Sequence, residues 1–136
     1  MREELKNHDG KIYCTLEYWP ETEIVYVNWT GFLPLNEVKT GANRAIELMK
    51  HNNASKLLNN TFEFRSAWDE SYEWVFQNAM PRAINAGMKR MAHVAPPFLF
   101  EQLIAKIIRQ RSIARGDAFL LKIFDDKESA LSWLLS

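Results

Sequence analysis

The stretch from residue 23 to residue 50 constrains the fold more than any other part of this chain. Its first part, Ile24 to Trp29, is a run of β-branched and aromatic residues typical of a strand, and Gly31 and Pro34 end that run. The apolar residues that follow recur at helical spacing and fall on one face of a helix: Leu35, Val38, Ala42, Ala45, Ile46 and Met49. A strand continuous enough to be buried, followed by an amphipathic helix, is the building unit of a layered α/β domain.

The rest of the chain extends this unit into the order ββαβαβαβα. Strands are predicted at residues 12–19, 24–29, 56–61, 89–95 and 117–124, and helices at residues 34–50, 66–86, 98–111 and 126–135. Residues 1–11 form a polar lead-in that we expect to fray, and Pro81 should kink or break the second helix. Each strand after the first hairpin precedes a helix, which implies right-handed crossovers and mostly parallel pairing. We therefore predict an α/β fold over residues 1–136: a single two-layer domain with a mixed five-stranded sheet and about four helices.

Composition argues against nucleic-acid binding, an internal disulfide and a membrane span. The chain has 17 basic and 17 acidic residues, which cancel, so no overall field favours nucleic acid. The single cysteine, Cys14, excludes an internal disulfide and suits a reducing compartment. No apolar run approaches the ~20 residues that span a bilayer, and polar residues follow Met1 in place of a signal region. We expect a cytoplasmic protein with no transmembrane segment and no nucleic-acid partner.

No residue pattern points to catalysis or to metal binding. The three histidines, His8, His51 and His93, are far apart in the sequence, whereas a metal site needs several converging ligands. His93 is expected to occupy a satisfied core or edge position, although a strand end in a parallel sheet can also line a cleft. Cys14 lies on the apolar face of its strand and is interpreted as a small buried hydrophobe. We expect no enzymatic activity, no catalytic residue, no metal and no cofactor.

Aromatic residues are unusually dense between Thr61 and Trp74 (TFEFRSAWDESYEW). They can belong to a core built from large side chains, or they can form an apolar groove or partner surface together with the predicted third helix. A loop of about five residues after a short strand cannot easily turn every side chain inward. At least one of Phe62, Phe64 and Trp68 should therefore stay exposed or contact a second chain, and a homodimer is the simplest such contact.

Three segments of the chain resemble the STAS superfamily, and their details are similar to its SpoIIAA-like (STAS/SEC14-like) subset. These segments are VYVNWTGFLPLNEVKTG, AGMKRMAHVAP and FDDKESALSWLL, and the resemblance extends from Ile12 to Leu135. It implies a small binding module. Regulators of this group carry an Asp-Ser-Ser/Thr-Gly-type motif where the third strand meets its helix, and phosphorylation there switches partner binding. The matching junction here, NNTFEFRS, lacks that motif, and its hydroxyls are Thr61 and Ser66.

The sequence thus leads to two hypotheses about function. The first is a non-enzymatic STAS-like binding or regulatory module that engages a protein partner and responds to phosphorylation at Thr61 or Ser66. Its partner surface is predicted to comprise Asn60, Thr61, Phe62, Phe64, Ser66 and Trp68. The alternative is a carrier or sensor that holds an apolar small molecule or lipid between the second and third helices.

Overall fold

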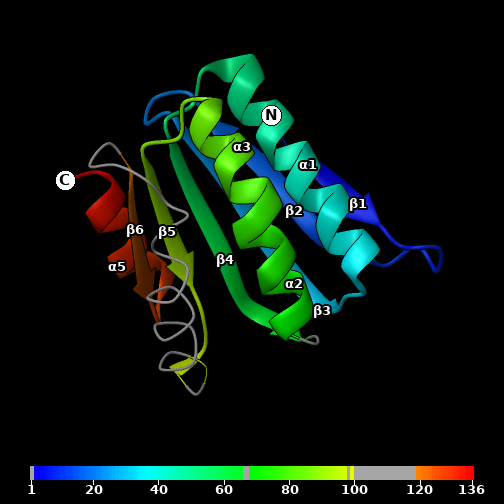
Figure 1. The fold of residues 1–136 in the computed structure, drawn as a ribbon. Helices are drawn as coiled ribbons and strands as arrows, with labels where there is room; N and C mark the ends of the chain where they lie inside the picture. The colour runs from blue at the N-terminus through cyan, green and yellow to red at the C-terminus, as the bar shows by residue number, and fades with distance from the viewer. Residues whose placement is uncertain (1, 66–67, 98, 100–118) are drawn as a thin grey trace.

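The computed structural model describes residues 2–65, 68–97, 99 and 119–136, and in these residues the chain forms one mixed sheet (Figure 1). Its six strands lie in the order in which they occur in the sequence. They are β1 (Arg2–Lys6), β2 (Ile12–Trp19), β3 (Ile24–Phe32), β4 (Lys56–Arg65), β5 (Arg90–Val94) and β6 (Leu120–Phe124). β1, β2 and β3 pair antiparallel, and β3, β4, β5 and β6 pair parallel. The predicted α/β class and mixed sheet are confirmed, whereas the predicted count of five strands is wrong.

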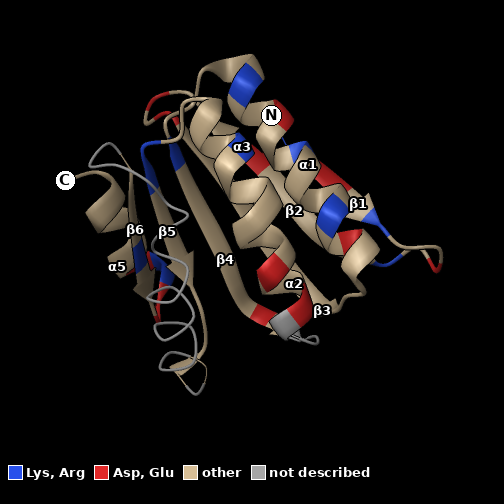
Figure 2. Cartoon of the chain, in the orientation of Figure 1, with Lys and Arg blue, Asp and Glu red and all other residues tan. Residues whose placement is uncertain are grey.

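The additional strand is β1, which lies in the stretch that we expected to fray. It pairs antiparallel with β2, with Arg2 opposite Glu17. The guanidinium of Arg44 on α1 (Leu35–Asn52) holds Glu3 through two hydrogen bonds, from Nε to Oε1 (2.7 Å) and from Nη2 to Oε2 (2.9 Å). Figure 2 shows charged residues of both signs along β1 and α1. A charged outer strand of this kind is one way in which natural sheets protect an edge from further pairing.

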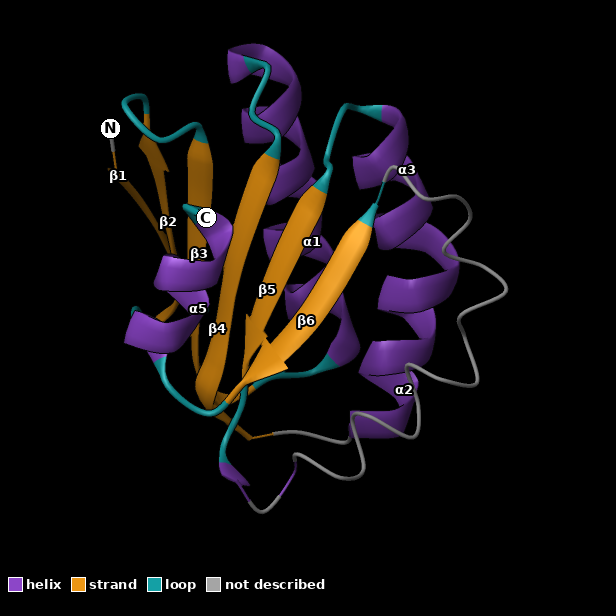
Figure 3. Cartoon of the chain, turned by 90° about the vertical axis from the view of Figure 1, so that its left-hand side faces the viewer, coloured by secondary structure: helices purple, strands orange, loops and turns teal. Residues whose placement is uncertain are grey.

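The described helices cover both faces of the sheet (Figure 3). One face carries α1 and a longer helical segment made of α2 (Trp68–Trp74), the π-helical turn η1 (Val75–Ala79) and α3 (Met80–Asn85). The other carries α5 (Lys127–Leu134), whose Ala130 and Leu134 are fully buried. Consecutive parallel strands with right-handed crossovers place their connecting helices on one face, which explains the first arrangement.

The expected two-layer arrangement therefore needs correction, and the described residues contain three of the four predicted helices. α5 adds a third layer, since its apolar face packs against Tyr26, Leu58 and Ala92 of the sheet. Its N-cap is Asp126, which accepts a hydrogen bond from Ser129 N. The helix predicted at residues 98–111 lies outside the described residues. Among the helices that the structure does describe, none is both long enough and apolar enough to cross a bilayer.

Pro81 interrupts the α-helical hydrogen bonds but does not break the helix into two. In the turn that precedes it, Met80 N donates to Val75 O, five residues back, and this bond closes the π turn η1. A proline has no N–H, so Gln77 O has no donor four residues ahead of it, and a wider turn accommodates that loss. The backbone stays helical through Met80 (φ −64°, ψ −47°). The interruption is thus a local π turn within a continuous helical segment.

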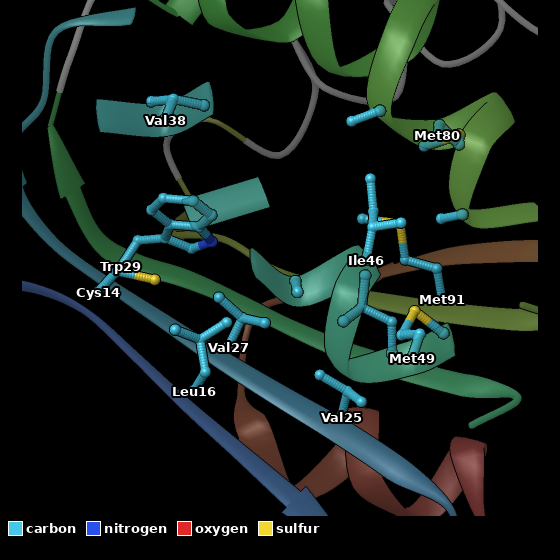
Figure 4. Close-up of a cluster of buried hydrophobic side chains, with 14 of the residues drawn as sticks. Cys14, Leu16, Val25, Val27, Trp29, Val38, Ile46, Met49, Met80 and Met91 are labelled. Atoms are coloured by element: carbon cyan, nitrogen blue, oxygen red, sulfur yellow. The ribbon is translucent and has the colours of Figure 1, made fainter. Parts of the chain in front are cut away.

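The main core lies between the sheet and the face that carries α1 and the α2–η1–α3 segment (Figure 4). Ile46 of α1 and Cys14 of β2 are buried there, as expected from the sequence. Gly41 lets α1 approach the sheet closely, because a Cβ at this position would lie only 2.5 Å from Cη2 of Trp29. The indole of Trp29 therefore packs directly against the backbone of α1.

Candidate functional site

The junction predicted to be a short strand and a loop is one long strand. β4 continues beside β3 as far as Arg65, because an irregularity in the pairing between Asn28 and Thr30 lets the two strands continue side by side. Phe62 is 42% exposed, whereas Phe64 is only 4% exposed and belongs to the main core. The expectation that at least one of these aromatic residues stays exposed is confirmed for Phe62. Ser66 and the side chain of Trp68 lie outside the described part of the structure.

A cavity of about 50 Å³ lies between the sheet and the α2–η1 segment and opens partly to solvent. Most of its lining is apolar: Trp29, Val38, Phe64, Val75, Phe76, Met80, Met91 and Leu121. The described part of the lining also includes five polar side chains: Asn59, Thr61, Ser71, Tyr72 and His93. A second cavity of about 60 Å³ adjoins the first and shares Trp29, Asn59, Val75, Met80 and Met91 with it. Figure 4 shows several of these side chains between the helices and the sheet.

Four of the polar side chains form one hydrogen-bonded cluster whose directions can be deduced from Trp29. The Trp29 indole Nε1–H can only donate, and it lies 2.7 Å from Asn59 Oδ1. This contact fixes the orientation of the amide, so Asn59 Nδ2 faces His93 Nδ1 at 3.1 Å and donates to it. The neutral imidazole of His93 must then carry its proton on Nε2.

The Nε2 atom of His93 faces two hydroxyl groups. It lies 2.8 Å from Tyr72 Oη and 3.2 Å from Thr61 Oγ1. The Thr61 hydroxyl donates to Val94 O over 2.8 Å, so towards His93 its oxygen acts as an acceptor. The rings of Tyr72 and His93 meet edge to face, with 5.7 Å between their centroids. The cluster therefore connects β3, β4, β5 and α2 at the wall of the cavity.

Burial keeps this cluster uncharged. Desolvation lowers the pKa of His93 from 6.5 to about 4, because removal from water penalises the imidazolium form. Desolvation also raises the pKa of Tyr72 well above its ordinary value, and the hydrogen bond with Thr61 offsets part of that rise. At neutral pH the cavity wall thus presents neutral donors and acceptors, which suits recognition of a polar group better than proton transfer.

The residues predicted to form one partner surface lie on two faces of the sheet. Thr61 and Phe64 line the cavity on the helix side. Asn60 lies on the other side, where its Nδ2 donates to Tyr26 Oη over 3.1 Å and its Oδ1 accepts from Phe62 N. Thr61 is buried and its hydroxyl is engaged, so a kinase would reach it only after local opening of the structure.

The sequence pattern allowed His93 to line a cleft, but it did not identify Asn59, Ser71 and Tyr72 as residues of the same site. A signal did exist in the strands. Asn59 and His93 are polar residues within two apolar runs, KLLNN and RMAHV, and parallel pairing places them directly opposite each other. Polar residues at matching positions of neighbouring buried strands are candidates for a shared hydrogen bond. The residues on α2 could not be assigned in this way, because their position depends on how the helix packs.

Comparison with known proteins leaves the family open. The chain has no significant match to any protein-family model, any curated protein or any solved structure. The resemblance to the STAS superfamily stays a prediction, and the functional conclusion has to come from the cavity and its polar wall.

Proposed function

We propose that this domain binds an apolar small molecule in the cavity beside the α2–η1 segment and acts as its carrier or sensor. The observation that carries this proposal is the composition of the cavity. Among the described residues, eight apolar side chains line this partly open cavity of about 50 Å³, and a hydrogen-bonded polar cluster forms one part of its wall. Ligand sites in proteins typically combine an apolar lining of this kind with a few placed polar groups.

The packing of the helical segment supports the same proposal. Val75 and Phe76 reach the cavity from the π turn η1, a rare helix geometry that occurs frequently at functional sites. A bound apolar ligand would gain dispersion contacts with these side chains.

Native mass spectrometry of the protein purified from its own cells tests this proposal. We expect a non-covalent adduct of small-molecule mass on the wild type. Val75→Phe should fill part of the cavity and abolish the adduct, at a stability cost of about 1–3 kcal/mol. Phe62→Ser is the matched control, since Phe62 is exposed and does not line the cavity. The absence of any adduct on the wild type, or its persistence in Val75→Phe, contradicts the proposal.

The second candidate function is the STAS-like regulatory module that engages a protein partner. The specific observation in its favour is aromatic exposure at neighbouring strands: Phe32 of β3 is 84% exposed and Phe62 of β4 is 42% exposed. Exposed aromatic side chains are enriched where proteins meet partners. Size-exclusion chromatography with light scattering tests self-association through these aromatic residues, with Phe62→Ser as the variant that should weaken it.

A further inference from the structure

The polar side chains of the cavity differ in how far their hydrogen-bonding capacity is used. Asn59, Thr61, Tyr72 and His93 bond one another or the backbone, as described above. The fifth, Ser71, is only 5% exposed and lines the cavity from α2. Its hydroxyl has no hydrogen-bond partner among the described residues. Because this hydroxyl is not engaged by another described residue, Ser71 is the polar side chain of the described lining that is most available to a polar group on a ligand.

The described part of this lining offers no group that would balance a charge. None of the described residues that line either cavity is Lys, Arg, Asp or Glu. The imidazole of His93, which belongs to the same wall, is held neutral by burial. A carboxylate or ammonium group placed here would lose its hydration without gaining a counter-ion, which is strongly unfavourable.

We infer that the ligand is an uncharged molecule with an apolar body and one hydroxyl or carbonyl group, and that Ser71 hydrogen-bonds this group. The inference rests on the proposed function, because it assigns the chemical class of the molecule that the cavity takes. A serine hydroxyl both donates and accepts, so it can bond either an alcohol or a carbonyl oxygen. The aliphatic and aromatic side chains around it would contact the apolar body.

The selectivity of the cavity can be measured with small probes of matched size. Toluene, 1-hexanol, hexanoate and hexylammonium are titrated at pH 7 into the full-length protein after removal of bound ligands. Chemical-shift changes of the Trp29 indole N–H and of the methyl groups of Met80 and Met91 report binding at the cavity. We expect toluene and 1-hexanol to bind, and the two charged probes to bind at least about tenfold more weakly than 1-hexanol.

Ser71 is tested in the same titrations. Ser71→Ala should weaken the binding of 1-hexanol by about fivefold to tenfold and leave toluene unchanged, because it removes only one hydrogen bond. Ser71→Thr keeps a hydroxyl and should restore binding of 1-hexanol, which separates the role of the hydroxyl from a general effect on folding. The melting temperature of each variant is measured alongside.

Each failure has a distinct meaning. Equal affinity for 1-hexanol and hexanoate overturns the assignment of an uncharged ligand while leaving the cavity as a binding site. An unchanged affinity of Ser71→Ala for 1-hexanol overturns the role of Ser71. If neither toluene nor 1-hexanol shifts the resonances of Trp29, Met80 and Met91, the proposed function itself is wrong, and the inference fails with it.

Discussion

The indole nitrogen of Trp29 donates a hydrogen bond to Asn59 Oδ1 over 2.7 Å, and this contact determines the protonation pattern of the cavity wall. An indole cannot accept, so the amide of Asn59 has only one orientation that satisfies both of its neighbours. That orientation places a donor against His93 Nδ1 and leaves the imidazole proton on Nε2. Two side chains that do not titrate thus fix the tautomer of one that does.

Asn59→Asp should raise the pKa of His93. The carboxylate can accept from the Trp29 indole and also from a protonated His93 Nδ1, so it favours the imidazolium form by about 1 to 3 pH units. NMR titration of the His93 ring measures this change. Asn60→Asp is the matched control, because Asn60 bonds Tyr26 on the other side of the sheet. A pKa of His93 that is equal in Asn59→Asp and the wild type would contradict the hydrogen-bond directions.

The burial of His93 predicts how stability depends on pH. Its pKa is about 4 in the folded protein and 6.5 in the unfolded chain, so the unfolded chain binds the extra proton first as pH falls. The free energy of unfolding should therefore be highest above pH 6.5 and fall towards pH 4, by about 3 kcal/mol from this group. Urea denaturation at pH 7, 5.5 and 4.5 measures the slope. His93→Gln cannot titrate and should show a smaller slope, so equal slopes for the two proteins would exclude His93 as its source.

Gly41→Ala should destabilise the protein although alanine is the better helix former. The added Cβ would lie 2.5 Å from Trp29 Cη2 and 2.7 Å from Cζ3, so α1 or the indole must move. The strain of overpacking, about 1–3 kcal/mol, outweighs a helix-propensity gain of about 1 kcal/mol. Denaturation midpoints measure the balance. In a Trp29→Phe background the clashing ring atoms are absent and the penalty should shrink, whereas equal penalties in both backgrounds would show that the contact is not the cause.

Phe62 and Phe64 are two residues apart on β4 and should respond oppositely to substitution. Phe62→Ser removes an exposed ring and should weaken any self-association or partner binding while the melting temperature stays nearly unchanged. Phe64→Ser removes a buried ring and should cost about 3–5 kcal/mol or prevent folding. Light scattering and thermal denaturation of both variants make the comparison. Unfolding of Phe62→Ser would show that this residue belongs to the core.

The sequence predicted those elements whose pattern is local. The β-branched run at Ile24 and the helical spacing of apolar residues around Ile46 led directly to β3 and α1. The expectation that residues 1–11 fray was wrong because Arg2–Lys6 forms a strand although it has no apolar alternation of its own. Its strand depends on pairing with β2 and on the ion pair between Glu3 and Arg44, 41 residues away. The local sequence of Arg2–Lys6 therefore could not predict this strand.

The site was harder to predict because it depends on register and helix packing. Asn59 meets His93 only through the alignment of β4 with β5, and Trp29 meets Asn59 only through that of β3 with β4. The end of β4 was misplaced for a similar reason, since an irregularity in its pairing carries the strand past Thr61. The aromatic density between Thr61 and Trp74 suggested either a core or a partner surface, and the structure buries Phe64 while it leaves Phe62 exposed. The sequence pattern did not predict that Thr61 faces the cavity whereas Asn60 lies on the opposite side of the sheet.

The most direct test of ligand binding in the cavity is a set of intermolecular nuclear Overhauser effects to its two shared methionines. Met80 of α3 and Met91 of β5 line both adjoining cavities, so their labelled methyl groups report on anything bound there. A molecule that co-purifies with the protein, or toluene added to the ligand-free protein, should give cross-peaks to both methyl groups and lose them in Val75→Phe. Binding without cross-peaks to either methionine would contradict the account.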